Sequence, residues 1–168
     1  MKRLRIIIIL FLVNILGCSE TSPTEEKLGN GRISLKGNIE NITIGMDSLS
    51  VINKLGEPDY YGIADIIIEN IILGYQIDEN GSLEISLFND YLVDSIFTVF
   101  QVKVRLEYLG TTENGIGIGS SKQEVIKFLG NEITYNVPKE YCEFNTRFIF
   151  SYNEQDIVDQ IAMAYYRE

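Results

Sequence analysis

The chain contains no histidine and no tryptophan, and only two cysteines and three prolines among its 168 residues. The absence of histidine excludes Ser-His-Asp and Cys-His catalytic arrangements and every metal site that needs an imidazole ligand. No glycine motif of the GxxxxGK[ST] or GxGxxG type follows a predicted strand, so the common nucleotide-binding loops are also missing. We therefore predict no catalytic residue, no metal ion and no cofactor, and a protein that is not an enzyme.

Basic residues are scarce. Fourteen Lys and Arg stand against 24 Asp and Glu, a formal net charge of −10. A surface of this sign repels phosphate backbones, so we expect no nucleic-acid partner. The acidity serves solubility or steers a basic partner, and we favour solubility.

The N-terminus is the main exception to the acidic balance. Lys2, Arg3 and Arg5 precede an unbroken apolar run from Ile6 to Val13. Even extended to Leu16, the run is roughly 16 Å of helix, about half of a hydrocarbon core. This pattern predicts a signal peptide over residues 1–17, and not a spanning helix.

The signal peptide ends in Ile15-Leu16-Gly17-Cys18, which resembles the lipobox of bacterial lipoproteins. The resemblance implies cleavage before Cys18 and acylation of its thiol, so that the bilayer is one partner of the mature chain. The alternatives are an ordinary signal peptide that contains a cysteine, or an uncleaved anchor. Ser19 in place of aspartate favours the outer membrane, on its periplasmic or its surface-exposed face.

Cleavage would remove three basic residues and change the formal net charge from −10 to −13. Residues 18–31 are polar and rich in turn formers, and we predict a flexible tether there. With Cys18 acylated, Cys142 has no partner for an intramolecular disulfide. We interpret Cys142 as a buried, inert thiol in preference to a reactive one.

A phrase recurs at an offset of 74 residues, at Ile42–Gly56 and again at Ile116–Gly130, with seven identities in 15 positions. An internal duplication accounts for this. Each copy predicts a short capped helix, over about 47–55 and about 121–129, with Asp47 and Ser121 as N-caps. Gly56 and Gly130 end the helices.

Strands are expected after each helix. Ile66–Ile77 and Leu83–Leu87 read as strands joined by an Asn-Gly turn, and a further strand returns from Leu92. The second copy repeats this order with Phe148, Phe150 and Tyr152 in place of core aliphatic residues. We therefore place that aromatic stripe in the core and not on a binding platform.

These elements predict an α+β fold of two tandem repeats, each a short helix packed on an antiparallel β-meander. Repeat 1 covers 32–109 and repeat 2 covers 110–168, sharing one core or a side-by-side sheet. Residues 42–60 and 116–132 resemble the helix-to-sheet element of the BamE (SmpA/OmlA) outer-membrane lipoproteins, and their tandem order resembles the β-lactamase-inhibitor-protein-like fold.

The resemblance implies a membrane-anchored, non-catalytic lipoprotein of the cell envelope that binds a protein partner, as an adaptor, assembly factor or inhibitor. Its partner-binding residues cannot be named from sequence. The alternatives are a carboxylate-dependent envelope hydrolase and a purely structural envelope lipoprotein. The sequence offers no pair of carboxylates with the spacing of a general acid and base.

Overall fold

The computed structural model describes residues 31–65, 70–76, 82–89, 96–106, 108–130 and 134–167. Its helices are α1 (Ser48–Leu55) and α2 (Lys122–Leu129). Its strands are β1 (Ile33–Ser34), β2 (Asn38–Ile39), β3 (Tyr60–Asp65), β4 (Asn70–Gln76), β5 (Ser82–Asn89), β6 (Phe97–Arg105), β7 (Thr134–Asn136), β8 (Thr146–Tyr152) and β9 (Val158–Tyr165). The predicted signal peptide, Cys18, residues 18–30 of the tether and the Asn80-Gly81 turn lie outside the described residues.

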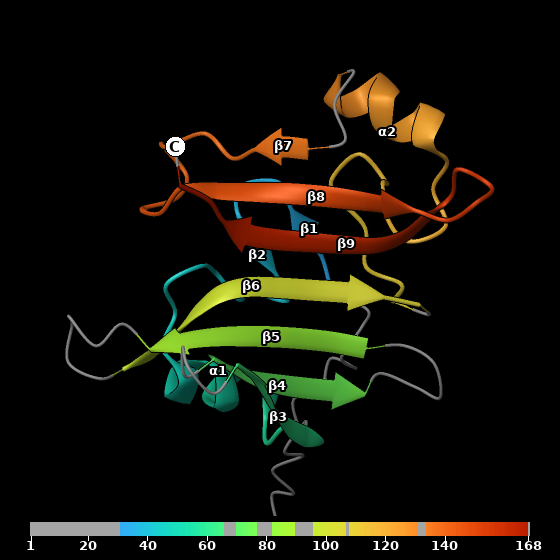
Figure 1. Cartoon of the computed structure of the whole chain (residues 1–168). Helices are drawn as coiled ribbons and strands as arrows, with labels where there is room; N and C mark the ends of the chain where they lie inside the picture. Colours follow the sequence, from blue (N-terminus) through green and yellow to red (C-terminus); the bar gives the residue numbers. More distant parts are fainter. Residues whose placement is uncertain are drawn as a thin grey trace, which may run out of the picture.

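The strands form two sheets. β1 and β2 pair only with each other, whereas the other seven form one antiparallel sheet in the order β3-β4-β5-β6-β9-β8-β7 (Figure 1). The centre of this sheet joins segments far apart in sequence, because Gln101–Arg105 of β6 pair with Gln160–Ala164 of β9. Backbone hydrogen bonds therefore run continuously from β3 to β7.

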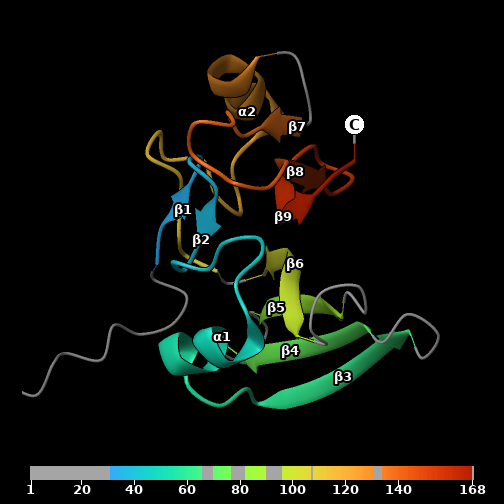
Figure 2. The same ribbon diagram turned by 90° about the vertical axis from the view of Figure 1, so that its left-hand side faces the viewer.

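One face of the large sheet is covered. α1, α2 and the β1–β2 sheet all lie on the same side of it (Figure 2). The side chains that point toward this side alternate along each strand, as Leu83, Ile85 and Leu87 do in β5, and all three are fully buried. Burial of each such side chain contributes roughly 1.5–3 kcal/mol. We call the opposite face of the large sheet the open face, since no described helix or strand lies over it.

The predicted aromatic stripe is confirmed as core in its first two members. Phe148 and Phe150 of β8 are fully buried, and they pair with Met163 and Ile161 of β9. Tyr152 is partly buried against the same cluster. An alternating aromatic strand therefore fills the core beneath α2 instead of presenting a binding platform.

Both predicted helices form within a residue of their expected bounds. The Asp47 carboxylate accepts the Ser50 amide hydrogen at 2.9 Å, and Ser121 and Glu124 form a reciprocal capping box. Each capping side chain accepts a hydrogen bond from a backbone amide of the first helical turn that has no partner within the helix. Val51 and Val125 are the fully buried residues of the two helices.

The loop before each helix is held by a strand in the same way. The Gly45 amide donates to the Val99 carbonyl at 2.8 Å, and the Gly119 amide donates to the Val158 carbonyl at 2.8 Å. Both glycines have positive φ, +86° and +90°. The repeated phrase thus encodes one local structure twice: a left-handed glycine, a strand contact and a capped helix.

The predicted α+β class of two helix-on-meander repeats is nevertheless wrong. The described part of the chain is mainly β: two helices of eight residues each accompany a seven-stranded sheet and a separate two-stranded sheet. β1 and β2 add Ile33 and Ile39 to a core cluster that contains buried residues from both halves. A repeat in the sequence predicts helices and strands that form locally. It does not predict that strands from the two copies pair with each other, as β6 and β9 do.

Among the described residues, no helix is both long and apolar enough to cross a membrane.

Candidate functional site

The two central strands of the large sheet separate at one end. β6 and β9 are paired as far as Gln101 and Ala164, and no pairing follows between Phe100 and Tyr165. The first half of β6 turns instead to the loop before α1, where Val99 both accepts from Gly45 and donates to Met46, each at 2.8 Å. Figure 1 shows the strands diverging toward the C-terminus.

A cavity of about 230 Å³ occupies this separation, and we call it the seam groove. Its lining consists of Ile44, Gly45, Phe88, Thr98, Val99, Phe100, Phe144, Tyr165 and Arg167. Four of these residues are aromatic, and Arg167 is the one charged residue in this described part of the lining. The rings of Phe88 and Phe100 meet edge to face, with centroids 6.5 Å apart and planes at 82°. This geometry is favourable for aromatic pairs and leaves ring surface available to a ligand.

Gly45 and Phe144 form the wall of the groove. A Cβ on Gly45 would lie 2.1 Å from the Phe144 ring, so the backbone of residue 45 is packed directly against that ring. Phe144 is 43% exposed and projects from the loop between β7 and β8. A loop from each half of the chain thus contributes to the wall.

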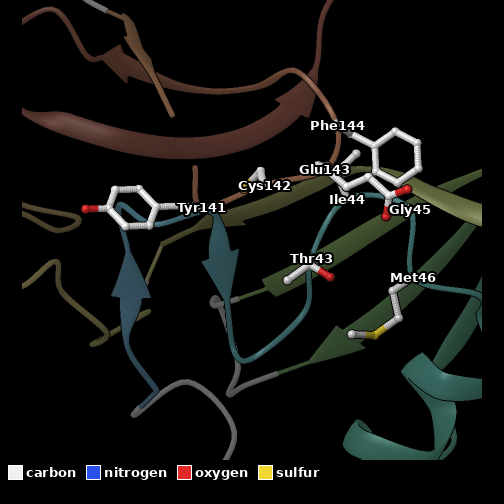
Figure 3. Close-up of a pocket in the computed structure, with 8 residues that line it drawn as sticks. All are labelled: Thr43, Ile44, Gly45, Met46, Tyr141, Cys142, Glu143 and Phe144. Atoms are coloured by element: carbon white, nitrogen blue, oxygen red, sulfur yellow. The ribbon is translucent and has the colours of Figure 1, made fainter. Parts of the chain in front are cut away.

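A second cavity, of about 310 Å³, shares Ile44, Gly45 and Phe144 with the groove. Figure 3 shows its two sides, Thr43–Met46 and Tyr141–Phe144. Glu143 brings a negative charge to this cavity, in contrast to the positive charge of Arg167 in the groove. Phe144 therefore divides two neighbouring cavities of opposite charge.

Cys142 lines the second cavity, and its burial is only partial. Its thiol donates to the Lys36 carbonyl at 3.3 Å. A Cβ on Gly37 would lie 2.1 Å from the Cys142 sulfur, which shows how closely the backbone approaches this thiol. The thiol ties the β7–β8 loop to the turn between β1 and β2, and it is less buried than the sequence interpretation required.

The open face carries a cluster of charges centred on Glu84. Its carboxylate accepts from Lys103 at 3.0 Å and from Tyr60 at 3.2 Å, and it also pairs with Arg105. Burial alone would raise the pKa of Glu84, but hydrogen bonds and charges from Lys103 and Arg105 outweigh it and hold the pKa below its ordinary value. Burial, together with Glu84, raises the pKa of Tyr60. The cluster locks β3, β5 and β6 together across the open face.

Arg147 of β8 also projects on the open face. Its guanidinium lies 4.3 Å from the centre of the Tyr166 ring, and its Nε donates to the Asn136 side-chain oxygen at 2.9 Å. The stacking fixes the guanidinium plane near the C-terminal end of β9 and leaves further N–H donors unassigned by these contacts. The arrangement is suited to binding and positions no pair of reacting groups.

Of the predicted site residues, Cys18 lies outside the described residues. No group of three or more His, Cys, Asp or Glu capable of holding a metal ion occurs within the described part of the chain. Sequence reasoning missed Phe88, Phe100, Phe144, Tyr165 and Arg167. These come from four separate segments, and no spacing in the sequence connects them.

Comparison with known proteins finds neither a matching family model nor a matching curated protein. Among solved structures, a DUF4309 family protein (YjgB) from Bacillus subtilis subsp. subtilis str. 168 is similar, with TM-score 0.49 and 13% identity, over 79% of this chain and 90% of that one. An extracellular protein containing a SCP domain from Bacillus anthracis str. Ames has TM-score 0.42 and 13% identity. That match covers 73% of this chain and 44% of that one, so the chain spans less than half of its length. Likeness at this level carries no conclusion about function.

Proposed function

We propose that this chain is a lipid-anchored protein of the cell envelope whose folded domain binds a protein partner at the seam groove. The observation that carries the proposal is the groove itself, where four aromatic side chains from separate segments line a cavity of about 230 Å³. Aromatic residues and arginine dominate the energetics of protein interfaces, because they bury large areas with few rotatable bonds.

The architecture supports binding at this place. The groove lies where hydrogen bonding between β6 and β9 stops, so it is bordered by rigid strands on one side and by the loops of Gly45 and Phe144 on the other. Rigid walls reduce the entropy lost when a partner is fixed. A site with four aromatic side chains and one guanidinium favours recognition over chemistry.

The anchor is the second part of the proposal. Lys2 to Arg5, the apolar run and Gly17-Cys18 support cleavage and acylation at Cys18, with the domain standing off the outer membrane on residues 18–31. The resemblance of residues 42–60 and 116–132 to the BamE element supports an adaptor, assembly or inhibitor role in the envelope.

A photocrosslinking amino acid at Tyr165 tests the groove in living cells. Tyr165 is 43% exposed, and Phe128 on α2 is 47% exposed, so Phe128 provides a matched control away from the groove. We expect one discrete adduct from position 165 and none of the same mass from position 128. Equal labelling at both positions, or no adduct at 165, would refute binding at the groove.

Fractionation tests the anchor. Cys18→Ser should release the protein from membranes and abolish incorporation of labelled palmitate, while Cys142→Ser should change neither. Palmitate that still enters Cys18→Ser, or loss of label in Cys142→Ser, would place the acylation elsewhere.

A further inference from the structure

The charged residue in the described lining of the groove is basic, although the chain as a whole is acidic. The whole chain has a formal net charge of −10, yet Arg167 is the one charged residue among the described residues that line the groove. Arg147 projects on the open face from β8, and β9 lies between β8 and β6. Adjacent strands are roughly 4.8 Å apart, so its strand is about 10 Å from β6.

These two guanidiniums differ from the side chains of Lys103 and Arg105. Lys103 and Arg105 are already paired with Glu84. Neither Arg147 nor Arg167 forms an ion pair with any carboxylate of the described residues. An arginine beside an aromatic surface that excludes water attracts a carboxylate more strongly than one in bulk solvent does.

We propose that the seam groove recognises an acidic peptide segment in which an aromatic or long aliphatic side chain is flanked by carboxylates. This rests on the proposed function and specifies the chemistry of the partner. The apolar side chain enters between Phe88, Phe100 and Phe144, and carboxylates on either side of it meet Arg167 and Arg147.

The neighbouring cavity gives the segment a direction. Glu143 lines the neighbouring cavity and Arg167 lines the groove, so a ligand carboxylate placed in the neighbouring cavity would meet a like charge. The segment therefore runs from the groove across the end of β9 toward Arg147, and not toward Cys142.

The direct test uses short fluorescein-labelled peptides and fluorescence polarisation on the purified full chain. The first peptide has a central phenylalanine with aspartates and glutamates on both sides. The second replaces the acidic residues by lysines, and the third keeps them but replaces the phenylalanine by serine. We expect the first peptide to bind at least about tenfold more tightly than the other two, because the second lacks the carboxylates and the third lacks the aromatic side chain.

Three variants assign the interaction to named residues. Arg167→Gln and Arg147→Gln should each weaken the first peptide about tenfold, as expected for loss of a charge-assisted hydrogen bond. Lys127→Gln should leave binding unchanged, because Lys127 lies on α2 away from the groove. All these side chains are at least partly exposed, so the variants should fold.

The outcomes separate this inference from the proposed function. Preference for the lysine peptide, or equal loss in Lys127→Gln, overturns the acidic chemistry. An adduct from Tyr165 in cells combined with no binding of the acidic peptide leaves the groove as a binding site and refutes its specificity. Tighter binding of the acidic aromatic peptide that depends on both Arg167 and Arg147 supports the inference.

Discussion

The contact between Gly45 and Phe144 can be dissected because the repeat supplies its own control. Gly45 and Gly119 occupy equivalent positions with φ of +86° and +90°, but a Cβ at Gly119 would meet nothing within 4 Å. An alanine in this left-handed region costs roughly 1–2 kcal/mol. Gly119→Ala should therefore lower the free energy of unfolding by about that amount.

Gly45→Ala has the same backbone strain and an additional steric conflict. Its Cβ would lie 2.1 Å from the Phe144 ring, which must move away. Phe144 is already 43% exposed, so outward rotation forfeits about half of the roughly 1.5–3 kcal/mol of a fully buried phenylalanine. We expect Gly45→Ala to cost about 1 kcal/mol more than Gly119→Ala.

Urea denaturation of the two variants, each in the wild-type and the Phe144→Ala background, measures this excess as a coupling energy. In the Phe144→Ala background the two glycine substitutions should cost the same. Equal costs in the wild-type background, or an excess that persists without the Phe144 ring, would show that the ring does not determine the glycine at position 45.

Three further predictions concern stability. Ser121→Ala should lower the free energy of unfolding by about 1 kcal/mol, because it removes the N-cap oxygen of α2; an unchanged urea midpoint would contradict this. Tyr75→Phe should cost about 1 kcal/mol through loss of the hydrogen bond from its hydroxyl to the Gly56 carbonyl at 3.1 Å. Burial raises the pKa of Tyr75 to about 12, so this tyrosine should stay neutral in the folded protein between about pH 10 and pH 12 while it ionises in the unfolded chain. The free energy of unfolding should therefore fall over this pH range, and it should fall less in Tyr75→Phe. Glu84→Gln should destabilise the protein at neutral pH, because the ion pairs of Glu84 hold the pKa of its carboxyl in the folded protein below the ordinary value of 4.5. The difference in stability from wild type should shrink as the pH falls below 4.5, where protonation removes those ion pairs. A difference independent of pH would exclude ionised Glu84 as the cause.

Local signals in the sequence were sufficient for the helices and for part of the core. The caps at Asp47 and Ser121, the spacing of apolar residues and the closing glycines located α1 and α2 within a residue. Strict alternation identified β5 and the core role of Phe148 and Phe150. These features depend on residues within one or two turns or along one strand, so a single sequence contains the information.

Strands with weaker patterns were missed. β3 begins in Tyr60-Tyr61-Gly62, and β7 has only three residues, so neither shows an extended apolar alternation. β2 has two residues and forms only because β1 lies beside it. Each is specified by the strand with which it pairs, and that partner is not evident from its own residues.

The sequence by itself determined the acidic balance, the absence of histidine chemistry, the two capped helices and the alternating core strands, because each is a property of composition or of neighbouring residues. Only the tertiary structure decided that the strands form one seven-stranded sheet, through the pairing of β6 with β9. It alone also decided the seam groove, since Phe100, Phe144 and Arg167 meet where that pairing stops. Contacts of this kind depend on how distant strand edges fit together, and the physical reason is geometric: no local preference of any one residue encodes them.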